Sequence, residues 1–321
     1  MENRLREIIE DFFESKGGRL FIGYRRRKNA FYASPAYIRG ASETQDISFG
    51  PFCPQNLAAH NPVEAAGEGK IGIALKGCDA RAIVELIKQN RIERKTIYAV
   101  GLPCEGQIDL KKLTRKFPDL GFQSVSEYRD EGDSFSVIIG EKRFSIKKSE
   151  AFFDKCYSCR HPENFDFDVT TGAVIPQRFD VPAEIMDIGA IESMSSSERR
   201  EFWENQFRQC LRCFACKNVC YGCYCRQCIF FTKEPRWLKK TAGSEENRAY
   251  HLIRAMHLAG RCIDCGECER VCPMNIPLRL LHQKVEKEIL AEFHMNPPGI
   301  STEGEPALQC FDTGDRDPFK E

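Results

Sequence analysis

The first fifteen residues alternate charged and apolar positions with the period of an α-helix. Apolar side chains recur every three or four positions, at Leu5, Ile8, Ile9, Phe12 and Phe13. A spacing near 3.6 residues is typical of a helix that buries one side against a core. The pattern therefore predicts a helix over residues 2–15 that caps an N-terminal domain.

Short apolar runs beyond this helix predict β-strands. Residues 20–24 and 31–38 are expected to form strands on either side of a basic turn at 25–29, which we interpret as solvent-exposed. Further along, residues 135–139 and 142–146 alternate polar and apolar positions and predict an antiparallel hairpin that turns at Gly140 and Glu141.

A strand, helix and strand succession lies between these two regions. Residues 70–75 and 96–100 predict buried strands, and residues 80–90 predict the helix that joins them. A connection of this length indicates a parallel pair, so both strands would end at the same edge of the sheet. Cys78 and Cys104, which follow the two strands, are then expected to lie close together.

The second half of the chain changes character. Residues 160–190 are rich in Pro, Asp and Gly and predict a linker, so we place a domain boundary near residue 190. Helical patterns follow, one starting at the capping signal of residues 195–198 and one over residues 245–258. The sequence therefore predicts two domains, over residues 1–190 and 191–295, with a C-terminal tail over residues 296–321.

The charge of the chain excludes some partners. Lys and Arg total 47, as do Asp and Glu, so no overall field attracts nucleic acid or an anionic membrane. The apolar runs are far shorter than the roughly 20 residues that cross a bilayer. The first residues also lack the apolar core of a secretory signal. We expect a protein of the cytoplasm, with no membrane span and no nucleic-acid partner.

Cysteine is the residue type that points to chemistry. The chain holds 17 cysteines, of which seven fall in residues 210–228 and four in residues 262–272. Scattered buried thiols would not cluster in this way. In a chain of this length without a secretory signal, such clusters indicate metal ligation or redox chemistry rather than disulfides.

Two stretches, residues 210–220 and 262–272, each carry the C-x2-C-x2-C-x3-C spacing of bacterial ferredoxins. In that motif three thiolates hold one [4Fe–4S] cluster and the fourth, a helical turn further on, reaches the other cluster. The first cluster is therefore expected on Cys210, Cys213, Cys216 and Cys272. The second is expected on Cys262, Cys265, Cys268 and Cys220.

Other cysteines lie outside these motifs. A third cluster could be held in the N-terminal domain by Cys78, Cys104 and the lone C-x2-C pair, Cys156 and Cys159. A further metal site, an alternative ligand set or a reactive thiol group could be formed by Cys223, Cys225 and Cys228. Cys53 and Cys310 are interpreted as structural. Zinc is the main rival to iron–sulfur clusters, although it usually takes paired cysteines without a third thiol two residues later.

The fold class follows from these motifs. We expect an α/β N-terminal domain with a mixed sheet, followed by an α-helical ferredoxin-like two-cluster domain. The two motifs are separated by about forty residues that include a helix, which resembles the α-helical ferredoxin domains of fumarate reductases and heterodisulfide reductase small subunits. Tyr221 departs from this pattern, because it stands where the first motif would normally have proline.

The motifs together resemble a known family. The run KGCDAR at residues 76–81, the turn GLPCEG at residues 101–106 and KCYSC at residues 155–159 precede the two ferredoxin motifs. The chain looks like the beta-subunit family of deazaflavin-coenzyme-reducing hydrogenases and formate dehydrogenases, in a version with a dicluster ferredoxin domain. The likeness spans roughly residues 50–290.

The resemblance carries expectations about cofactors. It implies an α/β domain that can hold one [4Fe–4S] cluster, with Cys78, Cys104, Cys156 and Cys159 at the ligand positions. In several members it also implies FAD, which exchanges a hydride with the deazaflavin coenzyme. This sequence has no G-x-G-x-x-G fingerprint after a strand.

Three functions are compatible with the sequence. The first is an electron-transfer subunit of a multi-subunit anaerobic oxidoreductase, working between a dehydrogenase, hydrogenase or flavin site and a heterodisulfide-reductase-like partner. The second is a FAD-containing subunit that exchanges hydride with a deazaflavin or nicotinamide coenzyme. The third is a zinc-stabilised interaction module. We rank them in that order, and no set of side chains indicates acid–base catalysis.

Overall fold

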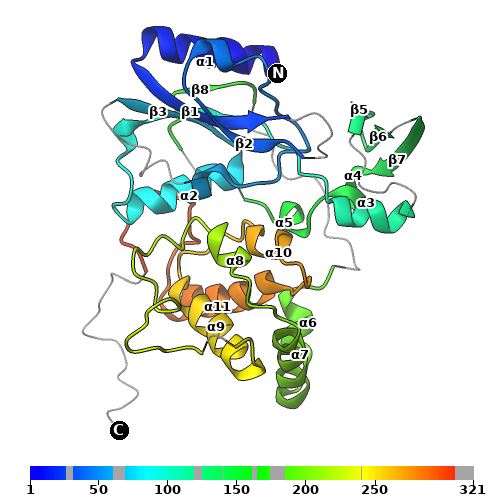
Figure 1. Ribbon diagram of the computed structural model, residues 1–321, viewed down its shortest axis with the longest axis vertical. Coiled ribbons are helices and arrows are strands. Elements are labelled where there is room, and N and C mark those ends of the chain that lie inside the picture. Colours follow the sequence, from blue (N-terminus) through cyan, green and yellow to red (C-terminus); the bar gives the residue numbers. More distant parts are fainter. Residues whose placement is uncertain are drawn as a thin grey trace.

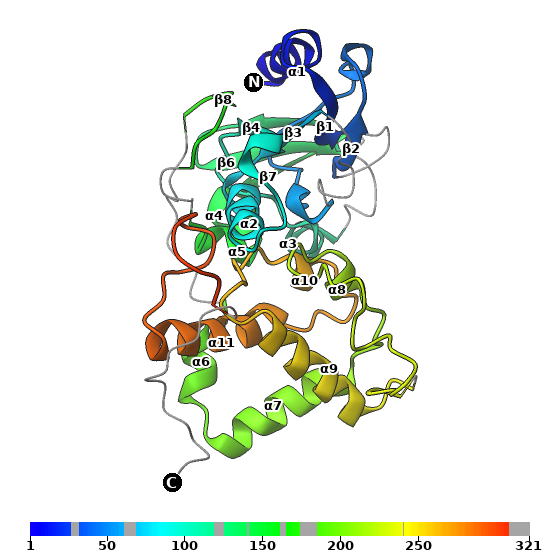
Figure 2. The ribbon, with the colours of Figure 1, turned by 90° about the vertical axis from the view of Figure 1, so that its left-hand side faces the viewer.

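The computed structural model describes residues 1–26, 32–60, 69–118, 125–139, 141–160, 165–173, 185–239 and 241–307. Part of the predicted basic turn, Gly140 of the predicted hairpin, parts of the predicted linker and Cys310 lie outside these ranges. Two sheets and their helices form one end of the molecule, and a group of helices forms the other (Figures 1 and 2).

The N-terminal region is built on a five-stranded mixed sheet. Its strands in spatial order are β2 (Ser34–Ile38), β1 (Gly18–Arg25), β3 (Lys70–Leu75), β4 (Ile97–Gly101) and β8 (Val169–Thr170). β1, β3, β4 and β8 run parallel, and β2 pairs antiparallel with β1. This confirms the α/β region with a mixed sheet. Helix α1 (Glu2–Ser15) covers one face, and α2 (Gly77–Lys88) lies on the other (Figure 1).

The predicted burial of the first helix is largely confirmed. Leu5, Ile8, Ile9 and Phe12 are buried in the main core, whereas Phe13 is only partly buried against it. The ring of Phe12 stacks on Tyr98 of β4. A helix with this apolar stripe is stabilised mainly by packing on the sheet rather than by its own hydrogen bonds.

β3, α2 and β4 form the predicted parallel unit, with one difference at the start of the helix. α2 begins at Gly77 rather than at residue 80. The reason is a reciprocal cap, in which the Asp79 carboxylate accepts a hydrogen bond from the backbone N–H of Lys76, 2.9 Å away. The same carboxylate accepts from the Leu57 N–H at 2.8 Å, so it also fixes the neighbouring loop. Cys78 therefore lies in the first turn of a helix and not in a loop.

A smaller antiparallel sheet lies beside the first (Figure 1). It contains β5 (Val125–Asp130), β6 (Ser134–Ile139) and β7 (Lys142–Lys147) in that order. The predicted hairpin is β6 with β7, and β5 is an additional strand that the alternation did not reveal. Short helices α3 (Leu110–Lys116), α4 (Lys148–Ala151) and α5 (Asp154–Tyr157) connect this sheet to the site region.

The second half of the described chain is helical. Its elements are α6 (Ile188–Ser193), α7 (Ser196–Arg208), α8 (Ala215–Asn218), α9 (Ser244–His257), α10 (Glu267–Arg270) and α11 (Leu278–Glu292). The predicted start of α7 is confirmed, because the Ser195 side chain accepts from the Glu198 N–H in a capping box. Among the helices that the structure describes, none is long and apolar enough to span a membrane.

The two regions pack against each other directly. Tyr221 and Ile263 from the helical region belong to the same buried core as the N-terminal sheet. The Tyr221 hydroxyl donates to the carbonyl of Arg261, so this residue ties the first motif to the segment before the second. Beyond α11, the chain returns to α2, where Arg81 donates to the Pro298 carbonyl at 2.6 Å. The joint between the regions is thus closed by apolar packing and by backbone acceptors.

Candidate functional site

Five cysteines from four segments of the chain line one cavity between the two regions. Four of them are the predicted N-terminal set and the fifth belongs to the second ferredoxin motif: Cys78, Cys104, Cys156, Cys159 and Cys265. The prediction that Cys78 and Cys104 lie close together is confirmed. The presence of Cys265 was not predicted, because it depends on how the helical region docks.

Each cysteine reaches this cavity through the element beside it. Cys78 is held in the first turn of α2, directly after β3. Cys104 follows β4, whose carboxyl end lies at the same sheet edge as that of β3. Cys156 is in α5, and Cys159 follows two residues after the helix ends. The edge of the parallel sheet therefore supplies two thiols, and α5 with the residues directly after it supplies two more.

Gln107 donates hydrogen bonds to two of the sulfur atoms. Its side-chain amide lies 3.3 Å from the sulfur of Cys104, and its backbone N–H lies 3.4 Å from the sulfur of Cys156. The other contacts of the side chain fix its position, because its oxygen accepts from the Cys53 N–H at 2.7 Å and its amide donates to Gly50. Hydrogen bonds of this kind favour a negatively charged sulfur.

Three buried cations also line the cavity: Lys76, Arg81 and Lys155. The Lys76 ammonium lies 2.9 Å from the Asp79 carboxylate and also contacts the Tyr24 hydroxyl. Lys76 is the N-cap residue of α2, and Arg81 lies within that helix. Lys155 was not anticipated, although it directly precedes Cys156.

The four N-terminal thiols are poor acids in this environment. Burial raises the pKa of Cys78 well above its ordinary value and also raises the pKa of Cys104. It raises the pKa of Cys156 to about 11 and that of Cys159 to about 12. The nearby Lys76 and Lys155 charges oppose this effect without cancelling it. Thiols of this type become thiolates when a metal takes the place of the proton.

The two ferredoxin motifs adopt the same backbone path. The second residue after the first cysteine is left-handed in both, with φ of 48° at Arg212 and 56° at Asp264. The fourth residue is also left-handed in both, at Phe214 and Gly266, and each then starts a one-turn helix, α8 or α10. Non-glycine residues rarely adopt this conformation, so its repetition indicates a loop shape set by a shared requirement.

The first motif closes over a small cavity with the last cysteine of the second. This cavity is lined by the complete predicted set for the first cluster: Cys210, Cys213, Cys216 and Cys272. The Tyr250 hydroxyl is 3.3 Å from the sulfur of Cys216, and His251 Nε2 is 3.2 Å from the sulfur of Cys210. Both partners come from α9, the helix between the motifs.

The predicted set for the second cluster is also gathered in one place. Burial is the main cause of the raised pKa of Cys262, Cys265 and Cys268, and the nearby Cys220 adds to it in each case. Arg254 of α9 lies between the two sets, because its charge acts on Cys216 as well as on Cys220 and Cys268. Nothing in the sequence distinguishes this arginine from other helical ones.

The three remaining thiols of the first stretch have different surroundings. Cys223 lies against Cys220 and near Arg254, so it adjoins the second set. Cys225 is exposed, and Cys228 is partly buried. Within the described part of the chain, no three His, Cys, Asp or Glu side chains are close enough to hold a single metal ion. A four-iron cluster does not require that closeness, because each thiolate binds its own iron.

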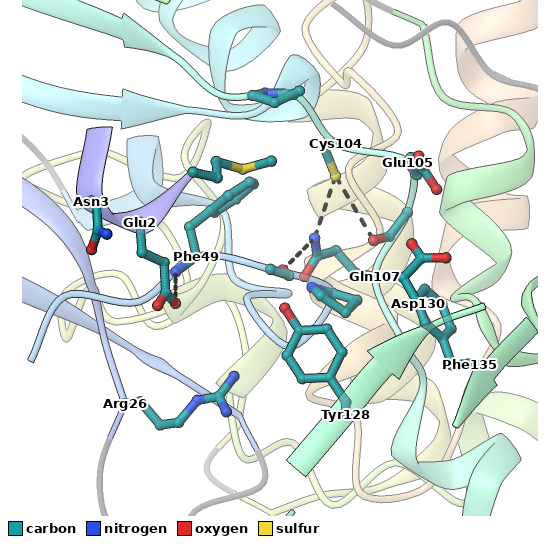
Figure 3. Close-up of a pocket in the computed structure, with 15 residues that line it drawn as sticks. Glu2, Asn3, Arg26, Phe49, Cys104, Glu105, Gln107, Tyr128, Asp130 and Phe135 are labelled. Carbon is teal, nitrogen blue, oxygen red and sulfur yellow. Dashed lines mark hydrogen bonds between the residues drawn. The ribbon is translucent and has the colours of Figure 1, made fainter. Parts of the chain in front are cut away.

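A larger cavity of about 550 Å³ adjoins the five-cysteine cavity. Residues 104–107 line both, so Cys104 stands in the wall between them. Its other walls come from α1, residues 49–51, β5 and β6, and carry Arg26, Tyr128 and Asp130 (Figure 3). Cavities of this size accommodate small organic ligands. No sequence motif marks it, because its residues meet only in the folded chain.

Known proteins resemble the chain over most of its length. Residues 68–219 match the family model that describes the C terminus of the beta subunit of coenzyme F420 hydrogenase/dehydrogenase. The F420-dependent formate dehydrogenase subunit beta of Methanocaldococcus jannaschii is 22% identical over 322 residues, which cover 84% of each chain. The F420-dependent formate dehydrogenase 1 subunit beta of Methanococcus maripaludis is 22% identical over 343 residues, covering 89% of this chain and 88% of the relative.

A solved structure also aligns in part. The F420-reducing [NiFe] hydrogenase complex from Methanosarcina barkeri contains a chain with 16% identity and a TM-score of 0.39, and the match covers 48% of this chain and 58% of that one. The matched family segment includes Cys78, Cys104, Cys156 and Cys159. Over residues 68–219, the chain is similar to the beta subunits of coenzyme F420 hydrogenases and dehydrogenases.

Proposed function

We propose that this oxidoreductase subunit transfers electrons through three iron–sulfur sites. The observation that carries the proposal is the position of Cys265. This residue belongs to the second ferredoxin motif and also lines the cavity of the N-terminal thiols. Two groups of cysteines that are separate in the sequence thus share a wall, as the members of an electron path must.

The three proposed sites use the cysteine sets predicted from the sequence. The N-terminal site would be held by Cys78, Cys104, Cys156 and Cys159. The middle site would be held by Cys262, Cys265, Cys268 and Cys220, and the last by Cys210, Cys213, Cys216 and Cys272. When bound, [4Fe–4S] clusters supply reversible one-electron transfer. The donor sets fit such clusters, since each consists of thiols grouped around a cavity or around one another.

The protein side chains would set the electrostatics of these sites. Lys76, Arg81 and Lys155 each favour negative charge on a nearby thiol, and Lys76 and Lys155 are also paired with the buried carboxylates of Asp79 and Glu267. Arg254 has the same effect between the other two sites. Hydrogen bonds from Gln107, Tyr250 and the Arg212 backbone to cysteine sulfurs act in the same direction.

The names of the relatives indicate what the path connects. They are subunits of F420-dependent formate dehydrogenases, and the matching family model includes hydrogenases as well. By analogy, we propose that the chain works in a multi-subunit anaerobic complex, between a dehydrogenase, hydrogenase or flavin site and a further protein. A heterodisulfide-reductase-like protein is proposed for that place, on the resemblance of the helical region.

A second candidate function is favoured by the cavity in Figure 3. It is large enough for an isoalloxazine ring, and its wall includes Cys104 of the N-terminal site. Tyr128 and Phe135 offer aromatic surface, and Arg26 offers a positive charge. In this function the chain would hold FAD and exchange hydride with a deazaflavin or nicotinamide coenzyme.

Metal and flavin analysis of anaerobically purified protein tests both functions. About twelve irons with equal acid-labile sulfide would support three sites, counting four per cluster. About eight would remove the N-terminal site, and zinc in place of iron would favour the interaction module. Flavin is measured by acid release and chromatography, because the clusters absorb in the same spectral range.

A blocking variant locates any flavin. Asn3→Trp places a large ring at the edge of the cavity, whereas Glu7→Trp adds the same ring to an exposed position of α1 that does not line it. Loss of flavin in Asn3→Trp alone supports the cavity as its site. Equal flavin in both variants would contradict that placement.

A further inference from the structure

Large apolar side chains are exposed beside the first ferredoxin motif. The exposed fraction of the residue is 61% for Leu211, 51% for Phe231 and 62% for Trp237. Cys213, one of the proposed ligands, is exposed on the same motif. We call Leu211, Phe231 and Trp237, with Cys213, the Trp237 surface.

The Trp237 surface is held in place by the motif itself. The ring of Phe231 packs edge-on against Phe214, with 4.8 Å between ring centroids, and Phe214 lines the cavity of the first motif. Leu238 packs against the apolar cluster around that cavity. The Arg212 guanidinium donates to the carbonyl of Lys239 at 2.6 Å and to that of Thr241. These contacts hold the segment with Phe231 and Trp237 against the first motif, which is the proposed cluster site.

The segment that carries this surface is rich in positive charge. Residues 210–239 contain six Lys or Arg residues and a single carboxylate, Glu234. Arg226, Lys233 and Arg236 are exposed, and none of them makes an ion pair with any residue that the structure describes. The chain as a whole has no net charge, so this basic excess is local. An acidic surface would complement it.

Exposed tryptophan beside arginine is typical of an interface rather than of free surface. Trp and Arg are enriched among the residues that contribute most to protein–protein binding, and an apolar centre with a charged rim is the usual interface layout. Trp237 and Phe231 both remain more than half exposed, so most of their apolar surface is available to a partner.

We propose that the Trp237 surface is the docking site for an acidic electron-transfer protein, and the point at which electrons enter or leave the chain. The inference rests on the proposed function, since it requires a redox centre at the first motif. The partner places an apolar patch on Trp237 and Phe231 and carboxylates opposite Lys233 and Arg236. One electron leaves one centre and one enters the other, with no bond made or broken.

Electron transfer to two soluble probes tests the proposal. The full chain, with its clusters, is reduced and mixed by stopped flow with an oxidised acidic bacterial ferredoxin or with basic cytochrome c, over a range of NaCl concentrations. The rate with ferredoxin should rise at least tenfold as the salt falls from high to low concentration. The rate with cytochrome c should not rise in this way.

Two variants and a matched control locate the contact. Lys233→Glu/Arg236→Glu should lower the low-salt rate with ferredoxin about tenfold or more, and the difference should disappear at high salt. Trp237→Ser should lower the rate at every salt concentration. Arg143→Glu/Lys147→Glu makes the same charge change on exposed positions of β7 and should leave the rate unchanged.

Iron content and the electron paramagnetic resonance spectrum distinguish a failure of the proposed function from a failure of the docking proposal alone. A protein without reducible clusters would overturn the proposed function, and the docking proposal with it. Full iron and unchanged spectra in all variants, together with equal rates for the β7 control and the Lys233/Arg236 variant, would overturn the docking site alone. A wild-type protein that reacts with ferredoxin no faster at low salt would do the same.

Discussion

Lys155 and Glu267 form a buried ion pair across the boundary between the two regions, with 3.0 Å between Nζ and Oε1. Their side chains are 6% and 2% accessible. Lys155 precedes Cys156 of the N-terminal site, and Glu267 precedes Cys268 of the second motif. Burial alone would raise the pKa of Glu267, but the charges of Lys155 and Arg270 lower it to about 2. One pair thus fixes both cysteine segments relative to each other.

The first prediction concerns this pair. Glu267→Gln removes the carboxylate that pairs with both Lys155 and Arg270, and leaves a buried ammonium without its counter-charge. We expect the free energy of unfolding to fall by about 3 to 5 kcal/mol, the range for breaking a buried pair. Chemical denaturation under anaerobic conditions measures it.

The control for this variant is Glu204→Gln. Glu204 pairs with Arg200 at a similar distance, 2.8 Å, but on the exposed surface of α7. Its loss should not change the unfolding midpoint measurably, because water screens exposed pairs. Equal effects of the two substitutions would show that burial is not the source of the stabilisation.

The second prediction concerns the N-terminal thiols. Cys159→Ser removes one thiol from the five-cysteine cavity and should lower the iron content by about four atoms per chain, the content of one cluster. Cys53→Ala also removes a buried thiol, but Cys53 does not line that cavity, so its iron content should match the wild type. Iron analysis that finds no loss in Cys159→Ser would count against a third cluster.

The third prediction concerns the backbone of the second motif. Gly266 has φ of 66°, and a Cβ there would lie 2.9 Å from the Cβ of Lys155 and 2.8 Å from its Cδ. Gly266→Ala should therefore lower the free energy of unfolding by more than the roughly 1 to 2 kcal/mol that left-handed backbone alone costs. Gly132→Ala, at φ of 86° with open space around it, should show only the backbone cost. Equal losses of unfolding free energy in the two variants would show that the close contact with Lys155 does not destabilise Gly266→Ala.

The fourth prediction concerns pH. Burial raises the pKa of Glu286 from 4.5 to about 8, and the neighbouring Glu85 acts in the same direction. The folded protein thus binds this proton more tightly than the unfolded chain, so stability from this group is present below pH 4.5 and is lost as the pH rises to 8. Above pH 8, Glu286→Gln should be more stable than the wild type by at least about 1.4 kcal/mol, the value of one pKa unit.

Denaturation at about pH 5 and about pH 9 measures this difference. The two proteins should be close in stability at the lower pH and clearly separated at the higher one. Glu292→Gln, on the exposed end of the same helix, serves as the control and should follow the wild type at both values. A Glu286→Gln variant that follows the wild type at both values would contradict the raised pKa.

The local structure of this chain could be predicted from sequence to a large extent. The stripe of Leu5, Ile8, Ile9 and Phe12 indicated α1 with its observed bounds, because helical periodicity is a local property. The short C-x2-C spacings likewise identified both motif loops. The sequence placed the start of α2 at residue 80, which is too late. Asp79 is the third residue of the helix, and its side chain caps the backbone of Lys76 from inside the first turn.

The arrangement of the site was decided by tertiary structure. Parallel pairing of β3 with β4 indicated that Cys78 and Cys104 would meet, since the edge of a parallel sheet follows from topology. The presence of Cys265, Lys155 and Arg254 at the cysteine sites could not be predicted from the sequence, because it depends on how distant segments pack together. The cavity at Cys104 has the same origin, since its walls come from α1, two loops and the second sheet.

Sequence alone therefore determined which residues can carry metal chemistry, and tertiary structure decided which of them stand together. A short C-x2-C spacing keeps the thiols of Cys210, Cys213 and Cys216 within one loop, so they can converge without help from distant parts of the chain. The approach of Cys265 to the N-terminal thiols has no such constraint. It depends on the burial of Ile263 and Tyr221 and on the pairing of Lys155 with Glu267, which only the folded chain brings into contact.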